Sequence, residues 1–123
     1  MRLLLRKGEW NGRQLIKPEL FEELYKSRIT VGPKVGYSLG WFVRDWNGHK
    51  VLEHGGNIDG FNAQVAFMPD QNVGLVMLSN VSASNLGTTA MNAVWENLVG
   101  GVKASAAPVE LASGPAVNPA SEA

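Results

Sequence analysis

The chain has 123 residues, enough for one domain with a modest hydrophobic core. Apolar residues make up 45% of it and charged residues 18%, which is typical of a globular protein and too apolar for a disordered one. Eleven basic residues balance eleven acidic ones and cysteine is absent. The composition therefore predicts no nucleic-acid-binding surface, and it excludes disulfides, cysteine-bound zinc and a thiolate nucleophile.

The N-terminal part of the chain predicts two short helices separated by a turn. Met1–Lys7 is expected to form the last turns of a helix, because its apolar core is too short for a signal peptide. Asn11-Gly12 predicts a tight turn between two short extended segments. Pro18 suits the first position of a helix, and an apolar stripe extends that helix over Pro18–Lys26. The next residues, Ser27–Lys34, are expected to form a loop.

The rest of the chain predicts an antiparallel meander followed by a helix. Strands are expected at Tyr37–Arg44, Lys50–His54, Phe61–Met68 and Val73–Ser79. Large apolar residues at helical spacing predict a helix that starts near Ser84 and is ended by Gly100-Gly101. Residues 102–123 are rich in Ala, Ser, Pro and Gly, which predicts a disordered tail or linker. The predicted fold class is α+β, an antiparallel sheet packed against N- and C-terminal helices.

A histidine that leads into glycines is the most informative feature of the chain. Gly55 and Gly56 follow His54 directly, and Gly60 completes an expected glycine-rich bend between two strands. Glycines at such a place indicate unusual backbone angles or the close approach of a ligand. Two interpretations stay open: His54 belongs to one wall of an active site, or it is a structural histidine with a hydrogen bond at a strand end.

A Gly-x-Ser-x-Gly pattern at Gly36–Gly40 matches the nucleophile elbow of other hydrolases. That elbow needs a turn from a strand into a helix, within a larger sheet than this chain can build. The residues after Ser38 predict a strand, so Ser38 is expected to be a strand residue.

The histidines and the turn residues predict no metal site. His49 and His54 lie five residues apart, and no carboxylate has the spacing of a third ligand. His49 falls in the turn expected at Trp46–His49 and is predicted to be solvated. Asp70 is a turn residue without an assigned role. The remaining large side chains are expected in the core, namely Trp41, Phe67, Met68 and Trp95.

Several segments, taken in order, resemble the C-terminal part of the serine β-lactamase-like hydrolases. These include class C β-lactamases, penicillin-binding-protein-type peptidases and related esterases. The resemblance covers roughly Met1–Gly101, which predicts that residues 1–101 are the C-terminal portion of such a domain. It is carried by Tyr37–Trp41, His54–Gly56, Gly60-Phe61, Val65–Asp70, Gly74–Asn80 and Ala93–Leu98.

The resemblance implies specific roles at the glycine-rich segment. This family forms an acyl-enzyme on the serine of a Ser-x-x-Lys motif, and its third motif is Lys-x-Gly or His-x-Gly, which His54-Gly55-Gly56 matches. It implies that His54 faces a small-molecule or peptide substrate, with Gly55 and Gly56 beside it. It further implies that the backbone N–H of Asn57 donates to the oxyanion. No cofactor is implied.

The chain departs from the family in one major respect. None of its serines has a lysine three positions later, and the family's second motif has no counterpart. The main interpretation is therefore a C-terminal fragment of a serine hydrolase that is inactive alone. One alternative is a non-catalytic assembly module that pairs through an exposed sheet edge. Another is a small esterase that uses Ser38. No segment has the features of a signal peptide or the length to span a membrane, and the localisation stays undetermined.

Overall fold

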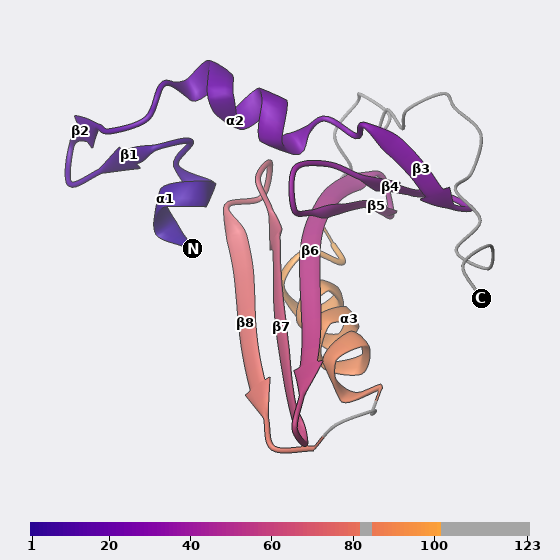
Figure 1. Ribbon diagram of the computed structural model, residues 1–123. Coiled ribbons are helices and arrows are strands. Elements are labelled where there is room, and N and C mark those ends of the chain that lie inside the picture. The colour runs from indigo at the N-terminus through magenta and orange to yellow at the C-terminus, as the bar shows by residue number, and fades with distance from the viewer. Residues whose placement is uncertain (82–84, 102–123) are drawn as a thin grey trace.

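A computed structural model describes residues 1–81 and 85–101 as an α+β fold (Figure 1). Strands β3 to β8 form one antiparallel sheet in chain order, and β1 with β2 form a separate hairpin. The predicted meander between N- and C-terminal helices is confirmed. The elements are α1 (Arg2–Leu5), β1 (Glu9–Trp10), β2 (Arg13–Gln14), α2 (Pro18–Tyr25), β3 (Ile29–Gly32), β4 (Val35–Tyr37), β5 (Phe42–Trp46), β6 (His49–Ile58), β7 (Phe61–Met68), β8 (Val73–Ser79) and α3 (Leu86–Leu98).

Three of the hairpins turn on two residues, Asn11-Gly12, Asn47-Gly48 and Asp59-Gly60. Both residues of each pair have positive φ, for example 47° at Asp59 and 89° at Gly60. This is the geometry of a type I′ turn, which Asn-Gly and Asp-Gly pairs favour because they tolerate left-handed backbone. The turn predicted at Asn11-Gly12 is confirmed.

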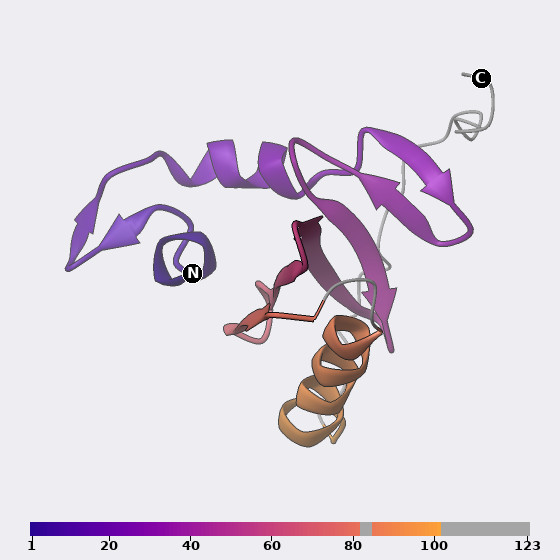
Figure 2. The ribbon, with the colours of Figure 1, turned by 60° about the horizontal axis from the view of Figure 1, so that its bottom comes forward.

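Helix α3 covers one face of the sheet, and α1 with α2 lie on the other (Figure 2). On the first face, Met91 and Trp95 of α3 pack against strand residues that include Ala66 and Met68. On the second face, Phe21 and Tyr25 of α2 pack against Leu52 and Phe67. The expected core residues Phe67, Met68 and Trp95 are fully buried, and Trp41 packs against the second cluster.

The second face is covered only at one end. Farther along the sheet, large apolar side chains stand out into solvent on this face, because cross-strand partners share a face and side chains alternate along each strand. We call this region the uncovered face, and define it by Ile58, Phe61, Val76 and Leu78, which are 72%, 60%, 60% and 78% exposed.

Two predictions for the first strands are wrong. The segment expected as a loop contains β3, which pairs with β4. The strand expected over Tyr37–Arg44 is divided, because β4 ends at Tyr37 and β5 begins at Phe42. Gly40 makes the division possible, since its φ of 86° turns the chain back on itself.

The expected glycine-rich bend is also wrong, because β6 continues through it. Gly55 pairs with Gln64 and Gly56 with Ala63, without a break in register. Of the three glycines in this segment, only Gly60 has a positive φ. Cross-strand pairing therefore outweighs the weak strand preference of glycine here.

The last helix begins at Leu86, close to the predicted start at Ser84. Ser84 itself and the tail predicted at residues 102–123 lie outside the described residues.

Candidate active-site wall

His54 lies where strand β6 loses one of its neighbours. The pairing of β5 with β6 ends at Phe42 and Glu53, so His54 is the first residue of β6 beyond β5. Its exposed imidazole stacks on Phe42, with ring centroids 5.9 Å apart and planes at 21°. The ring centroid of Tyr37 lies 6.4 Å from that of the same imidazole and 4.9 Å from that of Phe42. Two aromatic rings thus orient an imidazole that stays open to solvent.

These aromatic partners were not among the predicted site residues. Tyr37 and Phe42 are cross-strand partners of β4 and β5. The prediction of one strand over Tyr37–Arg44 excludes that pairing. The sequence signal for it is Gly40, which permits a tight return of the chain.

Glu53 holds β6 on the opposite face, directly before His54. Its side chain is only 6% exposed and forms an ion pair with Arg44 on the neighbouring strand β5. Because the pair is partly buried and joins adjacent strands, it fixes the end of the β5–β6 ladder next to the imidazole.

Gly55 and Gly56 leave the strand bare beside His54. A Cβ atom at Gly55 would collide with the side-chain amide of Gln64. A Cβ atom at Gly56 would meet nothing within 4 Å. The space beside Gly55 is therefore taken by the end of a flexible side chain, whereas the space beside Gly56 is open.

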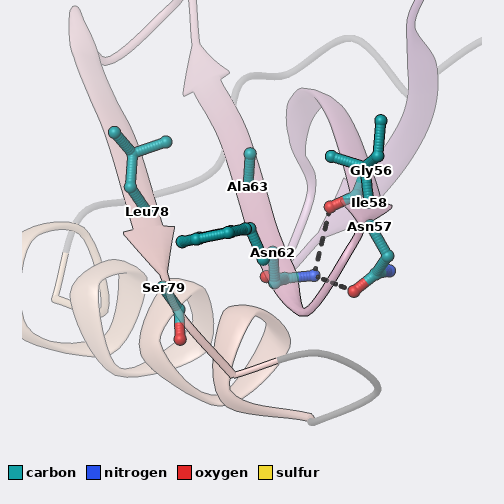
Figure 3. A pocket seen from close by; sticks show the side chains of 8 residues that line it. Gly56, Asn57, Ile58, Asn62, Ala63, Leu78 and Ser79 are labelled. Atoms are coloured by element: carbon teal, nitrogen blue, oxygen red, sulfur yellow. Dashed lines mark hydrogen bonds between the residues drawn. The ribbon is translucent and has the colours of Figure 1, made fainter.

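Gly56 also borders two adjoining hollows on the sheet. One has a volume of about 400 Å³ and is lined by apolar side chains that include Ile58, Phe61 and Leu78 (Figure 3). The other, of about 330 Å³, is lined by His54 and Val76 among others. The glycine thus opens the strand toward the uncovered face.

The peptide groups of β6 point alternately toward β7 and away from it, and the Asp59-Gly60 turn determines which of them do so. Ile58 and Phe61 flank the two-residue turn and are therefore a hydrogen-bonded pair. Because such pairs alternate along an antiparallel ladder, Gly56 bonds to β7, whereas the N–H groups of Gly55 and Asn57 point away from β7. The turn at Asn47-Gly48 gives the same alternation from the β5 side. The N–H of Asn57 therefore points to the edge on which β5 has ended.

Asn57 is held by the residue opposite it, Asn62 of β7. The Asn62 Nδ2 atom donates to Asn57 Oδ1 at 2.9 Å and to the Gly56 carbonyl at 3.4 Å (Figure 3). The four residues predicted for the site, His54, Gly55, Gly56 and Asn57, thus form one continuous strand segment at the open end of β6.

Ser38 is not a strand residue, which corrects that prediction. It lies between β4 and β5, is 5% exposed, and its Oγ donates to the Leu24 carbonyl at 2.6 Å. This bond caps the last turn of α2, where backbone carbonyls lack helical partners. The residues after Ser38 lead into a strand and not a helix, so the geometry is not that of a nucleophile elbow.

His49 is not solvated, which corrects a second prediction. It is 0% exposed, and its Nδ1 atom lies 2.8 Å from Asp70 Oδ2. The turn involves only Asn47-Gly48, so His49 becomes the first residue of β6. Asp70, to which the sequence assigns no role, thus forms a hydrogen bond to the buried His49 ring.

Residues 1–81 and 85–101 contain no group of histidine, aspartate and glutamate side chains that could hold a metal ion. Over the same ranges, none of the helices is both long and apolar enough to cross a membrane.

The antiparallel sheet with helices on both faces is consistent with a partial β-lactamase-like α+β fold. The family model described as beta-lactamase matches residues 2–98, and the chain belongs to this family.

Two comparisons with individual proteins agree. The unguisins hydrolase ungD of Aspergillus violaceofuscus (strain CBS 115571) is 38% identical over 58 residues, which is 46% of this chain and 10% of that protein. The solved structure of an octameric penicillin-binding protein homologue from Pyrococcus abyssi superposes with a TM-score of 0.69 at 22% identity. That superposition covers 83% of this chain and 22% of the other, and it shows a common fold. The chain therefore spans only a small part of either protein.

Proposed function

We propose that this chain is the C-terminal part of a β-lactamase-like serine hydrolase and supplies one wall of its active site. The intact protein would cleave an ester, an amide or a β-lactam through an acyl-enzyme on a serine outside this chain. The observation that carries the proposal is the place of His54: exposed, oriented by Tyr37 and Phe42, and on the same sheet face as the uncovered apolar side chains.

The uncovered face supports the proposal that another part of the hydrolase packs beside His54. Contiguous exposed apolar side chains mark a surface that another part of a protein covers. His54 and Val65 are cross-strand partners, as are Val65 and Val76, so the imidazole borders this surface. A segment that covers the face would therefore bring its own side chains next to His54.

The Met1 side chain marks where the cover of this face ends on β8. The Met1 side chain rests against Gly74, close enough that a Cβ there would collide with it. Gly74 and Val76 are two apart on β8 and share a face. The Met1 side chain thus covers this face of β8 at Gly74, and the cover ends before Val76.

The wall would act through three groups. The His54 imidazole would bind the substrate or assist proton transfer, and Gly55 and Gly56 would let the substrate approach the backbone. The Asn57 N–H would donate to the oxyanion of the tetrahedral intermediate. Loss of one such donor raises the barrier by about 3–4 kcal/mol.

The test is a fluorophosphonate serine-hydrolase probe applied to the purified, folded chain, with the intact mass as the readout. We expect no adduct, because no Ser-x-x-Lys motif is present and the Ser38 hydroxyl is bonded to Leu24. An active serine hydrolase in the same reaction is the positive control. An adduct mapped to Ser38 would overturn the proposal and favour the small esterase.

One observation favours a second candidate, an assembly module. In the described part of the chain, β8 pairs with β7 and has no partner on its other side. An open edge of this kind is a template for a strand from another molecule. Self-association through β8 is therefore the alternative.

A further inference from the structure

We propose that Asn62 is a positioning residue that holds the Gly56–Asn57 peptide in the direction needed by the oxyanion. The inference rests on the proposed function, because it extends the role given there to the Asn57 N–H. Asn62 lies on β7, directly opposite Asn57. Neither its sequence position nor the family resemblance points to it.

The geometry of one peptide unit carries the inference. The Gly56 carbonyl and the Asn57 N–H belong to the same planar trans peptide, so they point in opposite directions. Asn62 Nδ2 donates to that carbonyl at 3.4 Å, from the β7 side. Anything that fixes the carbonyl toward β7 therefore fixes the N–H toward the opposite edge, past which β5 has ended.

A second bond anchors the Asn62 amide itself. Its Nδ2 also donates to Asn57 Oδ1 at 2.9 Å. Both partners are acceptors, so only the NH₂ group of Asn62 can face them, and the orientation of the amide is defined. The side chain thereby connects both residues of the peptide that it holds.

The ladder already fixes the Gly56 carbonyl, which accepts the Ala63 N–H of β7, and Asn62 adds a second donor to the same oxygen. Gly56 has no Cβ atom to restrict rotation about its backbone, and the space around it is open. The Asn62 bond adds to the ladder bond from Ala63 in limiting that rotation. It also polarises the peptide, which makes the N–H on its other side a stronger donor.

Stability alone does not account for asparagine at this position. The other amide atom, Asn62 Oδ1, is buried and has no hydrogen-bond partner among the described residues. An unsatisfied buried acceptor is destabilising, and a strand generally favours β-branched residues over asparagine. The residue thus fits a positioning role better than a packing role.

The test compares Asn62→Ala with the matched control Gln64→Ala in the 123-residue chain. Gln64 follows on the same strand and side of β7 but lies opposite Gly55, one pair away from Gly56 and Ala63. The readout is the residual dipolar coupling of the Asn57 N–H, which reports the direction of that bond. We expect Asn62→Ala to move this coupling away from the strand value and Gln64→Ala to leave it unchanged.

The thermal midpoint separates positioning from packing. We expect the Asn62→Ala midpoint to equal or exceed that of the unsubstituted chain, whereas a structural residue would lower it. Asn62→Asp has the same size and lacks the donor at neutral pH, so it serves if the alanine variant fails to fold. An Asn57 coupling that stays at its original value in a folded variant overturns the inference and leaves the proposed function intact.

The intact hydrolase supplies the second readout. There we expect Asn62→Ala to lower kcat about tenfold with KM within twofold. Complete loss of an oxyanion donor lowers kcat about 10²–10³-fold, and a donor that only points in the wrong direction should lower it less. A reoriented amide with unchanged kcat would instead refute the oxyanion role of Asn57, and the positioning role with it.

Discussion

At the scale of single residues, Tyr25 shows how a side chain joins the two N-terminal helices. It is 3% exposed, and its hydroxyl donates to the Leu4 carbonyl of α1 at 2.6 Å. Its ring meets Phe21 and Phe67 edge to face. Burial, with a smaller contribution from the nearby Glu22 carboxylate, raises the pKa of Tyr25 to about 12.

This pKa predicts a loss of stability at alkaline pH. The folded-state pKa lies above the unfolded value of 10.0, so the stabilisation is complete below pH 10 and is lost as the pH rises toward 12. We expect the free energy of unfolding to fall by roughly 2–3 kcal/mol over this range. Urea unfolding at pH 9 and pH 11.5 measures it. Tyr25→Phe should weaken the pH dependence and Tyr37→Phe should not; equal slopes in both variants would contradict the assignment.

Ser38→Ala tests the structural role found for that hydroxyl. Its bond to Leu24 would be lost and a carbonyl of α2 left without its partner, which costs on the order of 1 kcal/mol. We expect a lower urea midpoint and the same absence of probe adduct as in the unsubstituted chain. A variant as stable as the parent would show that the cap contributes nothing.

The residue types at the site were predictable, but their contacts were not. The His54-Gly55-Gly56 motif and Asn57 are read from sequence order and family resemblance. The partners of Ser38 and His49 come from positions 14 and 21 residues away, and only folding brings them together. For this reason the sequence predicts a solvated His49, whereas the structure buries it.

At the scale of elements, the β6–β7 hairpin shows that pairing outweighs local preference. Gly55 and Gly56 suggested a bend, because glycine weakens a strand. The Asp59-Gly60 turn and the uninterrupted register with β7 keep them extended. Asp-Gly is a strong hairpin signal, and it identifies the true turn once it is weighed against the earlier glycines.

A pair of substitutions separates the two kinds of glycine. Gly60→Ala would place a side chain at a φ of 89°, which costs about 1–2 kcal/mol. Gly56→Ala has an ordinary strand φ and open space, so we expect it to stabilise the isolated chain by about 0.5–1 kcal/mol. Chemical unfolding of both variants measures the difference. A destabilised Gly56→Ala would show that this glycine serves the fold and not the site.

At the scale of the whole molecule, one face and one edge of the sheet are open at the same end. Figure 1 shows β8 as the last strand of the sheet, with α1 near one end of it. The uncovered face and the β8 edge meet at Val76 and Leu78. The rest of the proposed hydrolase and a second copy of the chain would compete for this one region.

The ladder directions indicate which substitution distinguishes them. Phe61 and Ile58 are a hydrogen-bonded pair, so alternate residues of β7 from Phe61 onward bond to β6 and the others bond to β8. By this alternation the N–H of Leu75 points to β7 and the N–H of Val76 points to the open edge. Val76→Pro therefore removes a donor from the open edge without removing a bond to β7. Val76→Ala is the matched control, because it also loses apolar surface but keeps the donor.

If the chain assembles through β8, light scattering should give twice the chain mass for the unsubstituted protein and for Val76→Ala, and a monomer for Val76→Pro. Main-chain pairing explains this pattern, because only the proline lacks the N–H that a neighbouring strand would bind. A dimer that persists in a folded Val76→Pro variant would exclude the β8 edge as the interface. A monomeric unsubstituted chain would remove the assembly alternative and leave the uncovered face to the rest of the hydrolase.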